Sequence, residues 1–140
     1  MFLLDTDVLS DLRKQRRNPG VAKWFDGVPD SDLHVSVVTI VEVERGIERQ
    51  RTIHKAFADD LSAWLDFTLR AFGERVLPLT VNIARRWGRL SGQLGNKELD
   101  LAIAATALEH GLTVVTGNTR HFHATGVTLL NPFRARSSRK

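Results

Sequence analysis

Short apolar runs alternate along the chain with longer segments in which apolar residues recur at helical spacing. An apolar run of about 4 to 8 residues bounded by polar residues is typical of a buried strand, whereas apolar residues three and four positions apart indicate one face of a helix. The runs predict strands over residues 1–5, 33–38, 75–79, 112–116 and 127–130. The helical pattern predicts helices over residues 7–15, 56–72, 81–94 and 101–110, a short one from 19 and another from 39.

The order of these elements predicts the fold class. Strands separated by helices pair in parallel through right-handed crossovers, so we expect an α/β protein with a parallel sheet of four to five strands. Ligand sites in such sheets lie beyond the carboxyl ends of the strands. Asp5 and Thr116 stand where two predicted strands end, and Thr39 and Glu42 follow the end of a third. These polar residues are therefore expected to meet at one edge of the sheet.

The chain length of 140 residues and the composition fit one domain. We expect this domain to cover residues 1–133 and a basic, flexible tail to cover residues 134–140. The chain has no cysteine, which excludes disulfide scaffolds and cysteine-rich zinc sites. No apolar run approaches the roughly 20 residues that span a bilayer, and the first residues lack the basic start of a signal peptide, so we expect a cytoplasmic protein with no membrane contact. The net charge of +4 favours a polyanionic partner, although many proteins without one carry a similar excess.

Three acidic residues near the predicted sheet edge each have a structural interpretation. Asp5 is placed to cap the helix that follows it. Thr39 and Glu42 have the spacing of a capping box, in which each side chain accepts from the other's backbone amide. Asp100 precedes an alanine-rich helix and is also placed as a cap. Taken singly, each carboxylate is explained by helix capping.

Taken together, the same carboxylates indicate a metal site. Three carboxylates at one edge repel one another, and at least one pKa rises unless a cation offsets the charge. Mg²⁺ is the natural cation, because it prefers oxygen ligands and keeps waters with which it meets substrate phosphate. Such an ion activates water and stabilises the departing oxygen in phosphodiester cleavage. We therefore expect Asp5, Glu42 and Asp100 to hold Mg²⁺, with Mn²⁺ as an alternative ion.

Five segments carry a resemblance to a known family. They are residues 2–9 (FLLDTDVL), 36–46 (SVVTIVEVERG), 100–108 (DLAIAATAL), 112–118 (LTVVTGN) and 126–132 (GVTLLNP). Together they resemble the PIN-domain ribonucleases, and specifically the VapC-type toxins of bacterial toxin–antitoxin pairs. The similarity spans nearly the whole chain in the right order, which is far more specific than any single motif.

The resemblance implies an α/β/α sandwich around a central parallel sheet, in which residues 1–133 form an endoribonuclease that hydrolyses RNA phosphodiester bonds. Asp5 and Asp100 would be the main metal ligands, and Glu42 would complete the pocket through a bound water or by aiding the attacking water. The family's fourth position is often acidic, whereas this chain has Asn118. An amide can orient phosphate but adds no charge, so our hypothesis is a single ion before substrate arrives.

The resemblance also implies partners besides the RNA substrate. They are a second copy of the chain, in a homodimer, and a small antitoxin protein that blocks the acidic pocket. Arg85, Arg86 and Arg89 lie along one predicted helix, where they would either contact RNA phosphate or simply face solvent.

Several further polar residues have two interpretations. Asp7 would enter the metal shell or, as we favour, help to start the first helix. Thr116 would hydrogen-bond within the pocket or simply end its strand. His121 and His123 are interpreted as surface histidines rather than general bases. Gly46 lies inside a predicted helix, where glycine costs about 1 kcal/mol relative to alanine, which suggests close approach of another backbone or a packing effect.

Two other functions fit parts of the sequence. The residues Asp5-Thr6-Asp7 match the strand-ending Asp-x-Asp of haloacid-dehalogenase phosphatases, but no lysine follows a predicted strand end as those enzymes require. The other alternative is a degenerate PIN domain that binds RNA or protein without cleavage, because Asn118 replaces an acid. Three retained carboxylates argue against it, since gathering like charges brings no structural benefit.

Overall fold

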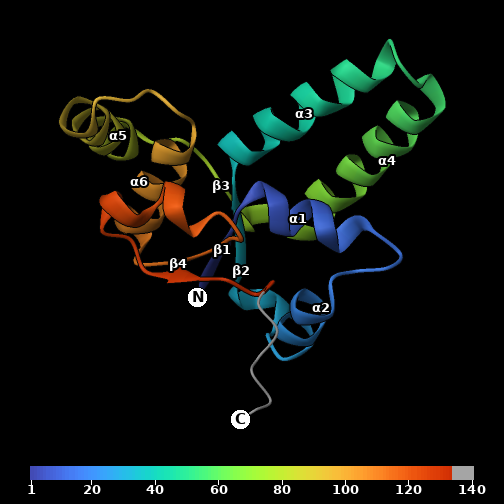
Figure 1. The fold of residues 1–140 in the computed structure, drawn as a ribbon, viewed down its shortest axis with the longest axis horizontal. Helices are drawn as coiled ribbons and strands as arrows, with labels where there is room; N and C mark the ends of the chain where they lie inside the picture. The colour runs from blue at the N-terminus through green and yellow to red at the C-terminus, as the bar shows by residue number, and fades with distance from the viewer. Residues whose placement is uncertain (134–140) are drawn as a thin grey trace.

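The structure, a computed structural model that describes residues 1–133, is built on a five-stranded sheet (Figure 1). Its strands are β1 (Phe2–Leu4), β2 (Leu33–Ser36), β3 (Val76–Leu77), β4 (Thr113–Val115) and β5 (Leu129–Leu130). The helices are α1 (Thr6–Arg13), α2 (Pro19–Asp26), α3 (Val37–Arg51), α4 (Lys55–Phe72), α5 (Val81–Leu94) and α6 (Asp100–His110). Short 3₁₀ turns cover Asp30–Asp32, Gly73–Arg75, Thr119–His121 and His123–Thr125. The predicted tail over 134–140 lies outside the described residues.

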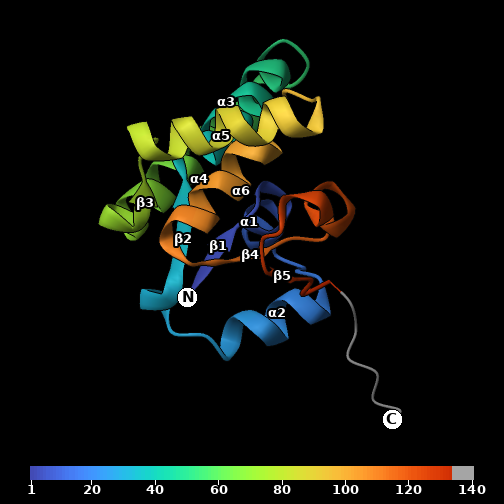
Figure 2. The ribbon, with the colours of Figure 1, turned by 90° about the vertical axis from the view of Figure 1, so that its left-hand side faces the viewer.

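The strands lie in the order β3-β2-β1-β4-β5, and every neighbouring pair is parallel. Successive residues of a strand point to opposite faces of a sheet. Leu3 accordingly packs in a core cluster with residues of α5 and α6, and Leu4 packs in a second cluster with residues of α1 and α2. Figure 2 shows α2 below the strands and α6 with α5 above them. The predicted α/β/α sandwich with a parallel sheet is confirmed.

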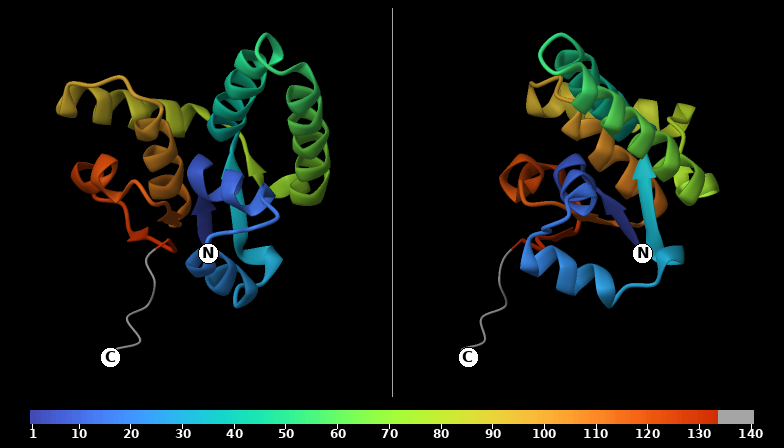
Figure 3. Two further views of the ribbon diagram at one scale, coloured as in Figure 1. Left: turned by 45° about the vertical axis from the view of Figure 1, so that its right-hand side comes forward. Right: turned by 90° about the vertical axis from the view of Figure 1, so that its right-hand side faces the viewer.

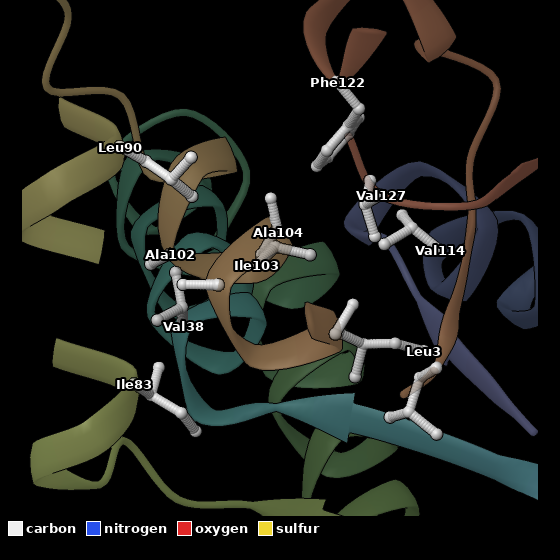
Figure 4. Close-up of a cluster of buried hydrophobic side chains, with 13 residues drawn as sticks. Leu3, Val38, Ile83, Leu90, Ala102, Ile103, Ala104, Val114, Phe122 and Val127 are labelled. Carbon is white, nitrogen blue, oxygen red and sulfur yellow. The ribbon is translucent and has the colours of Figure 1, made fainter. Parts of the chain in front are cut away.

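The alanine-rich helix α6 forms the centre of the first cluster. All of residues 101–107 are buried, because small side chains let this helix lie close to the sheet and to α5 at once. Figure 4 shows Ile103 among the side chains of Leu3, Val114 and Phe122. Burial of each such large side chain contributes about 1.5–3 kcal/mol, so this cluster fixes the first turn of α6 against the strand ends.

Helices α3 and α4 form an antiparallel pair that extends away from the sheet (Figures 1 and 3). Ile47, Ala58 and Leu65 are buried between them in a third cluster. Neither this pair nor any other helix within residues 1–133 is long and apolar enough to cross a bilayer.

Three local predictions are wrong. Helix α3 begins at Val37 rather than Thr39, because the Ser36 side chain caps it by accepting from the Val38 amide at 3.0 Å. Thr39 therefore lies inside the helix, and the capping box with Glu42 does not form. Asp100 is the first residue of α6 and caps nothing, since Leu99 occupies the cap position. A Cβ on Gly46 would meet nothing within 4 Å, so the expected close approach of another backbone is absent there.

Candidate active site

The carboxyl ends of β1 and β4 place two polar residues side by side in the middle of the sheet. Leu4 pairs with Val115, so Asp5 and Thr116 are the next residues of the two strands. The Asp5 amide donates to the Val115 carbonyl at 3.0 Å, which continues the strand pairing by one step. The parallel sheet thus brings together two residues that are far apart in the sequence.

Asp5 is both a helix cap and a pocket residue. Its Oδ1 accepts from the Thr6 amide at 2.8 Å, which caps α1 as expected. Its Oδ2 accepts from the Thr116 hydroxyl at 2.7 Å. The side chain is only 4% exposed, so both oxygens depend on these protein donors rather than on bulk water.

Burial is also the main reason why the pKa of Asp5 is raised from 3.8 to about 7. The hydrogen bonds from Thr116 and from the Thr6 amide lower this pKa, but the charges of Asp7 and Asp100 raise it again. Burial therefore favours the protonated carboxyl far more than water does. A cation beside it would return the group to its charged form.

Asp7 takes part in the same group of carboxyls. Its Oδ1 accepts from the Val8 amide at 2.8 Å, within the first turn of α1, and its Oδ2 accepts from the Gly117 amide at 2.8 Å. Burial raises the pKa of this carboxyl as well. A Cβ on Gly117 would lie 2.9 Å from Asp7 Oδ2 and 2.8 Å from the Phe133 ring, so this close approach requires glycine. Asp7 both helps to start the helix and belongs to the pocket.

Glu42 reaches the pocket through a neighbour of Asp5. From α3 its Oε1 accepts from the Thr6 hydroxyl at 2.5 Å, and Thr6 directly follows Asp5 in the chain. One turn earlier on α3, the fully buried Thr39 has a hydroxyl with no hydrogen-bond partner in the described part of the chain. An unsatisfied buried hydroxyl is costly, so Thr39 is an exception to the usual pairing of buried polar groups.

Asp100 enters from the first turn of α6, and its charge contributes to the raised pKa of Asp5. Its Oδ2 lies 3.0 Å from Nδ1 of His121, which the 3₁₀ turn after β4 carries. The Asp100 side chain is 19% exposed and thus remains partly accessible to solvent. His121 lies at the surface, as expected, with its side chain 57% exposed, and in addition it contacts a residue of the site.

Asn118 lies on the same segment but presents mainly its backbone. Its amide donates to the Thr116 hydroxyl at 2.9 Å, and its carbonyl accepts from the His121 amide at 3.0 Å. Its side chain is exposed and makes no hydrogen bond within residues 1–133, so its role toward phosphate or a bound water stays a prediction.

Three contributors to this site were missed by the sequence analysis. Thr6 was read as part of an Asp-x-Asp pattern, although its position beside Asp5 was a usable signal. Gly117 had no such signal, and His121 was considered only as a general base or a surface residue. Their contacts arise where the segment after β4 crosses the first turns of α1 and α6.

The donor chemistry of the site fits a hard divalent cation. Neither Asp5 nor Asp7 forms an ion pair within residues 1–133, so their negative charge has no protein counter-ion there. Over the same residues, no group of three or more His, Cys, Asp or Glu side chains is placed so that it could hold a metal ion, so Asp5, Glu42 and Asp100 do not form a three-ligand set. Mg²⁺ is usually held by one or two carboxylates, with waters and substrate phosphate supplying the remaining ligands. A site of few protein ligands is therefore consistent with this ion.

The sequence is similar to one family model and to known proteins over most of its length. The family model described as PIN domain matches residues 2–127. The VapC ribonuclease Y4jK of Sinorhizobium fredii is 32% identical over 95% of this chain and 98% of its own length. The toxin FitB of Neisseria gonorrhoeae is 29% identical over 95% of this chain and 99% of its own length.

Solved structures show the same similarity in three dimensions. The crystal structure of FitAcB from Neisseria gonorrhoeae superposes with a TM-score of 0.73 at 28% identity, covering 96% of this chain and 100% of that one. The structure of FitAB bound to the IR36 DNA fragment gives a TM-score of 0.76 at 27% identity and covers 99% of both chains.

Proposed function

The chain belongs to the PIN-domain family and resembles its VapC-type toxins, and from this premise we propose that it is a metal-dependent endoribonuclease and the toxin of a toxin–antitoxin pair. The observation that carries the proposal is the environment of Asp5. This carboxyl is 4% exposed, its pKa is raised to about 7, and the charges around it are those of Asp7 and Asp100. Such an arrangement is destabilising without a cation and is typical of a functional site.

Asp5 and Asp100 would hold the ion, and Glu42 would complete the pocket. Mg²⁺ is the expected ion, with Mn²⁺ as the alternative. When bound, the ion supplies positive charge that polarises water and offsets the charge developing on phosphodiester oxygens. Because one carboxylate oxygen of Asp100 already contacts His121, its other oxygen is the one left to face the pocket.

Four further side chains have a role in the proposal, either by orienting a carboxylate or phosphate or by accepting a proton. Thr6 holds Glu42 Oε1, which leaves Oε2 to accept a proton from the water that attacks phosphorus. Thr116 holds Asp5 Oδ2 and fixes the direction of that carboxylate. The exposed amide of Asn118 would orient a non-bridging phosphate oxygen at the rim.

The proposed partners follow from the relatives. Structures of toxin–antitoxin complexes match this chain over nearly its full length, including one from Klebsiella pneumoniae that covers 96% of it. We therefore expect a small antitoxin protein to block the acidic pocket, RNA to be the substrate and the toxin to form a homodimer.

The alternative of a degenerate PIN domain rests on Asn118, whose side chain adds no charge to the site. The buried and mutually repelling aspartates favour the enzyme over this alternative. The match of the PIN-domain family model over residues 2–127 disfavours the Asp-x-Asp phosphatase, whose pattern covers only Asp5-Thr6-Asp7.

The test is cleavage of total cellular RNA by the purified protein, free of antitoxin, in Mg²⁺ or Mn²⁺. New RNA ends are mapped for the wild type, for Asp5→Asn and for the matched control Asp26→Asn, whose side chain is exposed at the end of α2. We expect discrete cuts that EDTA and Asp5→Asn abolish and that Asp26→Asn leaves unchanged.

Calorimetry of Mn²⁺ binding separates the enzyme from the degenerate domain. Uptake by the wild type that is lost in Asp5→Asn supports the proposed site. A folded wild type that takes up no ion and makes no cut in either metal would overturn the proposal in favour of a binding domain.

A further inference from the structure

We propose that His121 is a positioning residue, which holds the Asp100 carboxylate in the orientation needed for metal binding and is not itself a ligand or a proton acceptor. The proposal rests on the metal-dependent nuclease function proposed above. Its basis is the 3.0 Å contact between His121 Nδ1 and Asp100 Oδ2.

The contact joins two well-anchored backbone segments. Asp100 is the first residue of α6, which is buried against the sheet over the next seven residues. His121 ends the 3₁₀ turn Thr119–His121, and its own amide donates to the Asn118 carbonyl at 3.0 Å. The next residue, Phe122, is fully buried in the core cluster beside α6. The imidazole therefore leaves a fixed backbone and meets a carboxylate on another fixed backbone.

The same short segment holds the other two aspartates of the site. At residues 116 and 117, the Thr116 hydroxyl donates to Asp5 and the Gly117 amide donates to Asp7. His121 adds the corresponding contact to Asp100, so residues 116–121 reach all three aspartates. A contact that completes such a pattern is more than an incidental surface pair.

A purely stabilising role does not account for His121. Its side chain is 57% exposed, and hydrogen bonds and ion pairs in such contact with water add little to folding. Asp100 is exposed to about a third of that extent and uses only Oδ2 in the contact. Outer partners of ligating carboxylates fix their orientation, and their removal typically weakens metal binding or activity about 10–100-fold.

The variants are chosen to separate orientation from other effects. His121→Ala removes the contact, whereas His121→Asn keeps an amide nitrogen close to the place of Nδ1. The matched control is His123→Ala, because His123 is exposed nearby and makes no hydrogen bond or ion pair within residues 1–133. All three are expected to unfold within about 3 °C of the wild type, which checks that the fold is kept.

The first measurement is Mn²⁺ binding by calorimetry, together with the Mn²⁺ dependence of RNA cleavage. We expect His121→Ala to weaken Mn²⁺ binding and to raise the activating Mn²⁺ concentration by about 10–100-fold, with kcat recovering at saturating Mn²⁺. His121→Asn should restore most of the affinity, and His123→Ala should match the wild type. A raised KM for RNA with unchanged Mn²⁺ affinity would instead place His121 on the substrate and overturn the positioning role.

The second measurement needs neither metal nor activity. Long-range ¹H–¹⁵N NMR of the metal-free protein should show His121 with its proton on Nδ1, and Asp100→Ala should shift the His121 signals but not those of His123. Unshifted His121 signals overturn the contact. A wild type without Mn²⁺ uptake overturns the proposed function and the positioning role together, whereas normal uptake and cleavage in His121→Ala overturn the positioning role alone.

Discussion

Two carboxylates of this chain are almost equally buried, yet their surroundings are opposite. Asp5 is 4% exposed and Asp11 is 5% exposed. Asp11, on α1, lies 3.7 Å from the Lys14 ammonium and accepts from the Asn18 amide at 2.9 Å. Asp5 also accepts two hydrogen bonds, but the charges that act on it are those of other acids, and its pKa is raised to about 7.

The difference distinguishes a buried charge that the fold explains from one to which the proposed function gives a role. Removing a carboxylate from water costs several kcal/mol unless an opposite charge and hydrogen bonds replace the lost hydration. Asp11 has both and ties the end of α1 to the start of α2, so its burial is explained by the fold. Within residues 1–133 Asp5 has no protein counter-charge, and the cation of the proposed function would supply one.

The largest expected effect is on RNA cleavage, when Asp5 and Asp11 are each replaced by asparagine. Asp5→Asn should reduce RNA cleavage well beyond the roughly 10–100-fold typical of outer-shell positions, because it removes a metal ligand. The same change should raise thermal stability above pH 7 by removing a buried charge. Asp11→Asn should keep cleavage and cost about 1 kcal/mol in free energy of unfolding. Cleavage rates and thermal melts of both variants check these expectations. Equal losses of activity would mean that Asp5 and Asp11 do not differ in their importance for cleavage.

The next effect is the dependence of stability on pH. Because the folded pKa of Asp5 lies above its ordinary value of 3.8, the folded protein binds more protons than the unfolded chain between about pH 4 and 7. The contribution of Asp5 to the free energy of unfolding is therefore greatest at low pH and falls as pH rises through this window, by about 4 kcal/mol in total.

Urea unfolding of the metal-free protein between pH 4 and 8 measures this contribution. The curves of stability against pH for the wild type and Asp11→Asn should fall in parallel. The curve for Asp5→Asn should lose the contribution of Asp5 and keep only the part that the raised pKa of Asp7 causes. Adding Mg²⁺ at pH 8 should recover stability in the wild type and in Asp11→Asn but not in Asp5→Asn. If Asp5→Asn keeps the full slope, Asp5 is not the group responsible.

A smaller effect is expected from Thr116→Val, which keeps the side-chain shape but removes the donor to Asp5 Oδ2. Loss of this bond should raise the pKa of Asp5 further and cost about 1–3 kcal/mol above neutral pH. The measurement is the shift of the stability–pH curve in EDTA, with Thr116→Ser as the variant that retains the hydroxyl. An unshifted curve for Thr116→Val would show that the Thr6 amide alone supports the carboxylate.

The smallest effect concerns the counter-charge of Asp11. The Lys14 side chain is 55% exposed and 3.7 Å from the carboxylate, so Lys14→Ala should cost less than about 1 kcal/mol. Denaturant melts should place this variant near the wild type. A much larger loss would mean that Asp11 depends on Lys14 rather than on the Asn18 amide, which is the stronger of its two contacts by distance.

The order and type of the elements could be predicted well from the sequence, because short apolar runs and apolar residues at helical spacing occupy separate segments of the chain. It misplaced the border between β2 and α3, since Val37 and Val38 suit a strand and a helix equally. The Ser36 cap decides between them, and a single hydroxyl contributes little to a periodic pattern. Gly46 suggested a close approach that the structure lacks, because a glycine's cost alone does not reveal what lies beside it.

For the site, the sequence indicated the acidic residues but not what holds them. Asp5 and Asp100 influence each other as charges, and Asp7 proves to be a member of the same group. The contacts from Gly117 and His121 depend on the path of one irregular segment, which no hydrophobic period encodes. Thr39 entered the prediction as a cap and is instead a buried hydroxyl without a partner in residues 1–133.

The bond between Asp5 and Thr116 joins residues 111 positions apart in the chain, and this has a consequence for synthesis. A ribosome makes the chain from the N-terminus at about 5–20 residues per second. Asp5, Asp7 of α1 and Glu42 of α3 leave it several seconds before the segment that orients the two aspartates. A nascent chain that stops short of β4 therefore carries carboxylates without their supports. The order of elements keeps the pocket incomplete until translation has nearly passed through the whole domain.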